Sequence, residues 1–322
     1  MILTVTLNAA VDRTYRIPHF ELDRVHRPSK QWVTAGGKGI NVARVLHTLG
    51  AGVVTTGILG GQSGEFILKS LEQSGIASHF VKTRGDSRLC IAVIDEITGS
   101  QTEINEVGPC VSHSEVEQLE QTVAELIELH RCDYVALSGS VPPGVDDRIY
   151  ARLISIVNKS GARAVLDSSG TALREAIEAR PWLVKPNRYE MASLIGQPDI
   201  SVADIPRAIE WLQRRGIPNV ALTLGAVGAL LCAGDWIGWA KPPKVTPISA
   251  VGCGDSFVGG FLYGMSQRLC PTSALAIAMG AAAANLESYG AALMPKDLIL
   301  KRSKNVTIQE IGMGEIGHAI LI

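Results

Sequence analysis

The sequence predicts an α/β protein whose central, mostly parallel sheet is covered by helices, with a small β-sheet lid inserted into it. Three observations support this prediction. Short apolar segments alternate with amphipathic ones from about residue 114 onward, which is typical of strand–helix units and of a parallel sheet. Glycine or polar residues follow these apolar segments, as they do at the ligand-binding edge of an open sheet. Residues 87–108 predict a separate hairpin, because two strand-like segments flank a tight turn there.

The composition is that of a large globular protein. The chain has 322 residues, of which 46% are hydrophobic, a length that allows one large α/β domain or two smaller ones. Its net charge of −1 argues against a protein that binds nucleic acid or a membrane surface. The six cysteines lie far apart, so we expect reduced thiols. The sequence shows neither a signal-peptide pattern nor a membrane-spanning run, and we therefore expect a cytoplasmic protein.

The chain begins with a predicted buried strand over residues 2–7. Asp12 follows the end of this strand, where open α/β sheets place their ligands. A surface turn is the alternative interpretation of Asp12. Residues 15–20 and 30–34 then predict two short, partly polar strands that belong with the hairpin in the small sheet.

A glycine-rich turn at residues 35–39 starts a predicted helix over residues 40–49. The turn is not a Walker A loop, because no serine or threonine follows its Gly-Lys pair. It nevertheless lets the backbone approach a ligand closely, with Lys38 and Asn41 in the first helical turn. The alternative for Lys38 is a solvated lysine at the start of a helix.

Regular alternation continues through the rest of the chain. Ser114 and Glu117 predict a capping box at the start of a helix. Polar or glycine residues follow four strands in succession, which indicates a ligand cleft along that edge of the sheet. The predicted strands are residues 53–60, 134–137, 164–166, 183–185 and 220–224, and the predicted helices include residues 64–74 and 275–286.

A second glycine-rich loop carries the pattern that points most directly to chemistry. Gly252 and Gly254 flank Cys253, and Asp255 follows at the start of a helix predicted over residues 256–268. Glycines allow a sharp turn, and the unpaired amides at a helix N-terminus attract anions. A carboxylate beside such an anion site suits phosphoryl transfer, in which it accepts the proton of the attacking hydroxyl. The alternative is a tight turn with a capping aspartate.

Together these motifs resemble those of the ribokinase-like (PfkB) carbohydrate kinases over about residues 1–300. The phosphosugar branch, which contains 1-phosphofructokinase, tagatose-6-phosphate kinase and the minor 6-phosphofructokinase, is the most similar. Each motif alone is weak evidence, but five of them in the expected order are strong. The matching segments are residues 35–44, 138–144, 185–187, 224–229 and 251–256, and residues 7–13 and 101–109 are typical of the phosphosugar branch.

This resemblance implies ATP- and Mg²⁺-dependent phosphorylation of a ketohexose phosphate, fructose 1-phosphate or tagatose 6-phosphate, to the bisphosphate. The implied catalytic residues are the base Asp255 and the backbone amides of Gly252, Cys253 and Gly254. The implied substrate-binding residues are Asp12, Arg27, Gly37, Lys38, Asn41, Arg88 and Ser138. The implied nucleotide-binding residues are Lys185, Asn187, Thr223, Gly225, Gly228 and Asn285, and the implied metal-binding residues are Glu190 and Asp167.

The resemblance also implies that the small sheet is a lid over the sugar. Its segments would be residues 12–34 and 88–107, inserted in a large domain of residues 1–11, 35–87 and 108–322. Both faces of the strand expected over residues 89–94 are apolar, so we expect a homodimer closed through the lid. The alternative is that helices of the same chain cover the second face.

The sequence leaves the substrate open. Leu89 follows Arg88 where the phosphosugar branch often has a polar residue, so the identity of the sugar phosphate is in doubt. Alternative functions are a 6-phosphofructokinase, another PfkB sugar or nucleoside kinase, and an inactive nucleotide-binding regulator. Asp255 argues against the regulator, because a protein that only binds a nucleotide needs no base.

Overall fold

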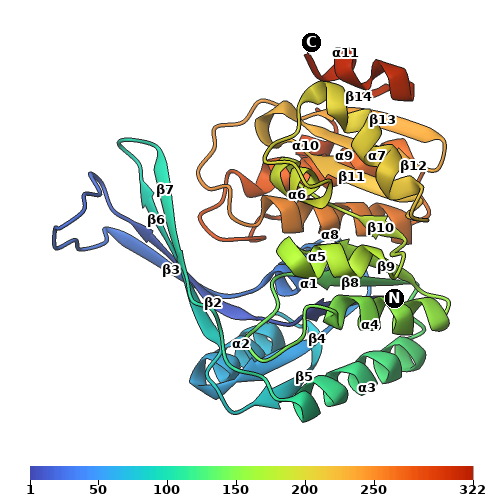
Figure 1. The fold of residues 1–322 in the computed structure, drawn as a ribbon. Coiled ribbons are helices and arrows are strands. Elements are labelled where there is room, and N and C mark those ends of the chain that lie inside the picture. The colour runs from blue at the N-terminus through green and yellow to red at the C-terminus, as the bar shows by residue number, and fades with distance from the viewer. Residues whose placement is uncertain (322) are drawn as a thin grey trace.

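A ten-stranded sheet forms the centre of the computed structural model, which describes residues 1–321 (Figure 1). From one edge, the strand order is β5-β4-β1-β8-β9-β10-β11-β12-β13-β14. The strands from β5 to β11 are parallel, and β12 to β14 continue the sheet antiparallel. Their bounds are β1 (Ile2–Thr6), β4 (Val53–Gly60), β5 (Ala77–Thr83), β8 (Tyr134–Ser138), β9 (Arg163–Asp167), β10 (Leu183–Val184), β11 (Asn219–Thr223), β12 (Ala229–Ala233), β13 (Trp236–Lys241) and β14 (Thr307–Glu310). The mostly parallel sheet expected from the sequence is confirmed.

Helices cover both faces of this sheet, because each helix has an apolar side that must be buried. One face packs against α3 (His113–His130), α4 (Ile149–Lys159), α5 (Gly170–Ile177), α6 (Arg188–Leu194), α7 (Ile205–Gln213) and α11 (Ile316–Leu321). The other packs against α1 (Lys38–Leu49), α2 (Gly61–Gln73), α8 (Cys253–Ser266) and α9 (Pro271–Asn285), with α10 (Lys296–Ser303) behind α9. Among residues 1–321, no helix has the length and apolar character needed to cross a lipid bilayer.

Helices α8 and α9 pack unusually closely because their contact surface consists of small residues. A Cβ atom on Gly264 would lie only 2.7 Å from Cα of Ala274, so this contact requires glycine. The alanine-rich sequence of α9 therefore serves helix packing. This packing fixes the start of α8, which carries the second glycine-rich loop, against the rest of the domain.

A second, four-stranded sheet projects from the side of the main body (Figure 1). Its order is β3-β2-β6-β7, with β2 and β6 parallel and the other pairs antiparallel. The strand expected over residues 15–20 is wrong in position, because β2 begins at Ala10 and ends at Arg16, paired along its whole length on both sides. The bounds are β2 (Ala10–Arg16), β3 (Lys30–Gly36), β6 (Arg88–Asp95) and β7 (Ser100–Asn105).

Other local expectations also differ from the structure. The capping box of helix α3 lies two residues earlier than predicted: it is formed by Ser112 with Glu115 and not by Ser114 with Glu117. Strands β5, β12, β13 and β14 were not expected. All four lie at an edge of the sheet or in antiparallel pairs, outside the run of parallel strands that the alternation of strand and helix predicted.

Candidate active site

A cavity of about 660 Å³ opens between the carboxyl ends of the central strands and the small sheet. Segments far apart in the sequence contribute to it, as expected at this edge of an α/β sheet. Of the residues predicted from the sequence, those that line it are Asp12, Gly37, Lys38, Asn41, Arg88, Lys185, Asn187, Glu190, Thr223, Gly225, Gly228, Gly252, Cys253, Gly254 and Asp255.

Asp255 lies in the first turn of α8, at the floor of this cavity. Only 6% of its surface is exposed, and the side-chain amide of Asn41 donates a hydrogen bond of 2.8 Å to its Oδ2. Burial raises the pKa of Asp255 to about 6, although the nearby charge of Lys38 opposes the shift. At neutral pH the carboxylate is therefore ionised and more basic than an exposed aspartate, as a general base must be.

The backbone before Asp255 turns at Gly252, which caps α8 with a φ of 81°. A Cβ atom there would lie 2.6 Å from Cβ of Ala291, so space as well as conformation requires glycine. The amides of Gly252 and Gly254 find no acceptor among the described residues, whereas the Cys253 amide donates to the carbonyl of Ala250 at 3.2 Å. The anion site expected from three amides thus has only the two glycine amides free.

Two lysines converge on Asp167 at the end of β9. Its Oδ1 accepts a hydrogen bond of 2.8 Å from Lys38 and lies 3.4 Å from Nζ of Lys185. Burial alone would raise the pKa of Asp167, but the two lysines outweigh it and hold the pKa below its ordinary value. Asp167 is fully buried and does not line the cavity. In this structure Asp167 holds two lysines through Oδ1, and its expected metal-binding role stays a prediction.

Asn187 and Glu190, which were predicted to lie near the nucleotide, are held by a capping box at the start of α6. Oδ1 of Asn187 accepts from the amide of Glu190 at 2.9 Å, and Oε2 of Glu190 accepts from the amide of Asn187 at 2.8 Å. Lys185 is 4% exposed and precedes this turn, so its ammonium is fixed by its surroundings. Thr223, Gly225 and Gly228 line the cavity from the end of β11 and the turn that follows.

Side chains of the small sheet line the opposite wall. Burial raises the pKa of Asp12 to about 7, and its carboxylate fits because Gly36 has no Cβ, which would lie 2.1 Å from Oδ2. Arg88 donates from Nε to the carbonyl of Asn8 and from Nη1 to that of Glu106, each at 3.2 Å. These bonds fix the guanidinium at the wall of the cavity.

Two strongly polar residues of this wall were not among those predicted from the sequence. Glu103 and Asn105 line the cavity from β7. They are two positions apart on one strand and therefore share a face. The alternation of residues within the segment 101–109 is the sequence signal that points to these two residues.

Three predicted residues lie outside the cavity lining. Arg27 is on the exposed loop between β2 and β3. Ser138 is fully buried at the end of β8, and its hydroxyl has no partner within residues 1–321. Asn285 is fully buried, donating to the carbonyl of Val251 at 2.7 Å and accepting from the amide of Ala292 at 2.7 Å. Asn285 thus braces the loop before Gly252, and its expected place near the adenine stays a prediction.

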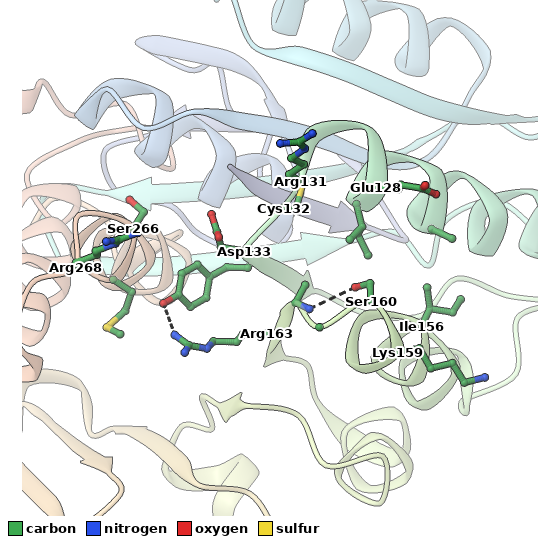
Figure 2. Close-up of a pocket in the computed structure, with 16 residues that line it drawn as sticks. Glu128, Arg131, Cys132, Asp133, Ile156, Lys159, Ser160, Arg163, Ser266 and Arg268 are labelled. Carbon is green, nitrogen blue, oxygen red and sulfur yellow. Dashed lines mark hydrogen bonds between the residues drawn. The ribbon is translucent and has the colours of Figure 1, made fainter.

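A larger hollow of about 1170 Å³ lies at the other end of the strands, around the start of β8 and β9 (Figure 2). Its charged groups are already engaged or dispersed. The terminal amine lies 3.0 Å from Asp133, and Arg163 donates to the hydroxyl of Tyr134 at 2.8 Å. Arg131 and Arg268 lie at separate points around the hollow (Figure 2). No set of polar groups converges there, so the smaller cavity is the candidate active site.

Comparison with known proteins gives a consistent result. The model of the pfkB family of carbohydrate kinases matches residues 5–297. A Staphylococcus aureus protein described as a phosphofructokinase is 31% identical, with a TM-score of 0.80 and coverage of 97% of this chain and 99% of its own. A Thermotoga maritima protein described as a 1-phosphofructokinase is 27% identical, with a TM-score of 0.87 and coverage of 97% and 99%. Phosphofructokinase-2 from Escherichia coli, in complex with substrates and products, is 28% identical, with a TM-score of 0.87 and coverage of 94% and 98%.

Proposed function

This chain belongs to the pfkB family of carbohydrate kinases, and we propose that it transfers the γ-phosphoryl group of ATP to a hydroxyl of a ketohexose phosphate. The proposed acceptor is fructose 1-phosphate or tagatose 6-phosphate, and the product is the bisphosphate. The observation that carries the proposal is the buried Asp255 carboxylate, which directly follows the free amides of Gly252 and Gly254 in one cavity with Lys185 and Arg88. A base, an anion site and a basic group at each end are what this reaction requires.

In the proposed reaction, Asp255 accepts the proton of the attacking sugar hydroxyl. The hydroxyl oxygen forms a bond to the γ-phosphorus, the bond from that phosphorus to the bridging oxygen breaks, and ADP leaves with the electron pair. Negative charge on the transferring group faces the amides of Gly252 and Gly254 and the positive end of the α8 dipole. Lys185 lies on the nucleotide side, where an ammonium neutralises phosphate oxygens.

The residues present fit a Mg²⁺ ion that accompanies the nucleotide. Protein sites for Mg²⁺ in kinases supply one or two carboxylates, and substrate phosphates with water supply the other ligands. Glu190 offers one such carboxylate at the cavity, held in place by its bond to the Asn187 amide. When bound, the ion would neutralise charge on the phosphates. Among the described residues, no cluster of three metal-binding side chains is present, which agrees with an ion held mainly by the substrate.

The other wall is proposed to bind the sugar phosphate. The fork of the Arg88 guanidinium matches the oxygens of a phosphate group, and its backbone bonds keep it oriented. We expect Asp12 and Asn41 to bind sugar hydroxyls, together with Glu103 and Asn105, because all four line the cavity. Because several of these side chains come from the small sheet, residues 12–34 and 88–107 are proposed to act as a lid over the sugar.

A coupled ADP-release assay tests this function. Fructose 1-phosphate, tagatose 6-phosphate, fructose 6-phosphate, ribose and adenosine are compared as acceptors, and turnover is expected with a ketohexose phosphate. The Asp255→Asn variant should lower kcat by at least ~10²-fold, the usual scale for removal of a general base, with ATP affinity little changed. Preference for adenosine or ribose would contradict the proposed substrate. Near-normal turnover of Asp255→Asn would reduce Asp255 to a helix cap.

A second candidate function is a 6-phosphofructokinase. The observation that favours it is the match to E. coli phosphofructokinase-2, which equals the match to the 1-phosphofructokinase in TM-score and nearly equals it in identity. The apolar Leu89 beside Arg88 is a further reason to keep this candidate. In the assay above, a higher kcat/KM for fructose 6-phosphate than for the other two sugar phosphates would select it.

The small sheet is also proposed to hold a homodimer together. Large apolar side chains are exposed on its strands and loops, among them Leu22 (87%), Val25 (88%), Ile97 (61%) and Ile104 (58%). Such a surface favours association, and the E. coli relative has a tetrameric inhibited form. Light scattering should give a dimer mass, and Ile104→Glu should shift it toward the monomer. A fully active wild-type chain near 34.3 kDa at micromolar concentration would contradict the dimer.

A further inference from the structure

A chain of hydrogen bonds behind the active site connects Arg44 to the carboxylate of Asp255. Nη1 of Arg44 donates to Oδ1 of Asn41 at 3.1 Å, and Nδ2 of Asn41 donates to Oδ2 of Asp255 at 2.8 Å. Asn41 and Arg44 are three positions apart on α1, so they are neighbours on one side of that helix. None of the functional roles assigned above uses Arg44.

The donors and acceptors of these three side chains fix the direction of the two hydrogen bonds. A guanidinium only donates hydrogen bonds, and an ionised carboxylate only accepts them. The amide of Asn41 lies between the two, and it can satisfy both only with its oxygen toward Arg44 and its nitrogen toward Asp255. Without Arg44, the amide is free to rotate by half a turn and present its oxygen to Asp255.

The guanidinium of Arg44 is itself held by backbone on two sides. Its Nη1 also donates to the carbonyl of Ala291 at 2.9 Å, and its Nη2 donates to the carbonyl of Ala35 at 2.5 Å. Ala35 belongs to β3 of the small sheet, and Ala291 contacts Gly252 in the glycine loop. Arg44 is therefore anchored to the two segments that border the base, and it cannot turn away from Asn41 without breaking these bonds.

We propose that Arg44 is a positioning residue for the base: it fixes the amide of Asn41 in the orientation that donates to Asp255, and so keeps the Asp255 carboxylate ionised and aimed at the substrate. The proposal rests on the proposed function, since it assumes that Asp255 is the base.

Loss of this orientation has a defined effect on Asp255. An amide nitrogen that donates a hydrogen bond to Asp255 lowers its pKa, whereas an amide oxygen in that place would accept a hydrogen bond from protonated Asp255 and favour its neutral form. Other charges act on Asp255 from every neighbouring element, namely Lys38 and Arg44 on α1, Asp12 on β2, Asp167 at the end of β9 and Lys185 after β10. The effect of the amide must therefore be separated from the effect of the Arg44 charge.

The experiment measures the ionisation of Asp255 directly, by carbon-13 NMR of protein labelled at aspartate carboxyls, with Asp255→Asn used to assign the signal. Arg44→Met removes both the positive charge and the hydrogen-bond donors of the guanidinium. Arg44→Lys keeps the charge but replaces the guanidinium by a single ammonium nitrogen. We expect the pH at the midpoint of the Asp255 titration to rise by about one unit in Arg44→Met and by less in Arg44→Lys. An unchanged midpoint in whichever variant folds overturns the proposal.

A double-mutant cycle shows whether the effect passes through Asn41. In an Asn41→Ala background, Arg44→Met should raise the midpoint by less than half as much as it does in the wild type. Full additivity would mean that Arg44 acts by its charge alone and would overturn the proposal. Arg302→Met is the matched control, because Arg302 also makes paired bonds, here to Glu287 at 2.7 Å, but lies away from Asp255. It should lower thermal stability without moving the midpoint.

If the protein has the proposed activity, the dependence of kcat on pH gives a second test of the role of Arg44. The acid limb of the kcat profile should then move upward with the NMR midpoint in Arg44→Met, with KM for ATP little changed. Since the titration needs no turnover, an inactive wild-type protein would count against the proposed function but leave the test of Arg44 intact. A shift of KM without a shift of the acid limb would show that Arg44 holds substrate and does not position the base.

Discussion

Lys38 donates a hydrogen bond of 2.8 Å from its ammonium to Oδ1 of Asp167. This bond fixes the charge of Lys38 at the cavity, which Lys38 lines. The expected contact of Lys38 with the sugar stays a prediction. Burial works against the charge of Lys38, but Asp167, Asp255 and Glu190 outweigh it and raise the pKa of Lys38 above its ordinary value. Lys38 is thus a permanent positive charge that helps Asp255 to ionise.

The first prediction is the pH dependence of turnover. Asp255 must be ionised to accept a proton, and burial raises its pKa to about 6, so kcat should rise with pH through this value. Asp167→Asn removes a negative charge that disfavours ionised Asp255 and frees Lys38 and Lys185. In this variant the acid limb of the profile of kcat against pH should therefore move to lower pH. Measurement of kcat against pH at saturating substrates tests this, and an upward move would contradict it.

The second prediction concerns stability. The pKa of Asp255 is raised from 3.8 to about 6 in the fold, so its contribution to stability is complete below pH 3.8 and lost as pH rises through about 6. Asp255→Asn removes this penalty and should increase the free energy of unfolding near neutral pH by about 1–3 kcal/mol, with no gain in strong acid. Urea unfolding at several pH values measures it.

Asp167→Asn is the matched control for the stability measurement, because it is the same substitution at another buried site with a shift of opposite sign. The lysines lower the pKa of Asp167, so this carboxylate contributes stability above pH 3.8 that is lost as pH falls through its lower folded value. Asp167→Asn should therefore destabilise the fold at neutral pH. The same sign of change in both variants would show that charge burial does not control their stability.

A third prediction concerns the phosphate of the substrate. Arg88→Ala should raise KM for the sugar phosphate by an amount equivalent to about 1.5–3 kcal/mol, the range for a hydrogen bond to a charged group, with KM for ATP nearly unchanged. Arg84→Ala is the control, since Arg84 is exposed nearby and does not line the cavity. An equal rise of both KM values in Arg88→Ala would point to damage of the small sheet.

The fourth prediction separates backbone from side chain in the glycine loop. Gly252→Ala should lower kcat at least ~10-fold, because the added Cβ clashes with Ala291 and displaces an amide that faces the transferring group. Cys253→Ala should keep near-normal kcat, since the backbone amide is kept and only the bond that the thiol accepts from Asn285 at 3.4 Å is lost. Steady-state kinetics of both variants decide it. Loss of activity in Cys253→Ala alone would show that the thiol takes part.

Much of the fold and the site follows from the order of motifs along the chain. Strand–helix alternation predicted the parallel sheet, and the glycine loops predicted where Asp255 and Asn41 stand. What the sequence could not show is which polar groups meet each other. Asn41 and Asp255 are bonded although they are 214 positions apart. For the same reason the bracing role of Asn285 could not be foreseen.

The parallel pairing of β2 with β6 has a consequence for how the protein folds. Ala10 pairs with Arg88, so the centre of the small sheet joins segments separated by all of β3, α1, β4, α2 and β5. Closing so long a loop is slow, because its entropy is lost before the contact forms. During synthesis the β2–β3 hairpin emerges first and waits with an open edge for β6. The small sheet therefore cannot be completed until the chain has been synthesised through β7.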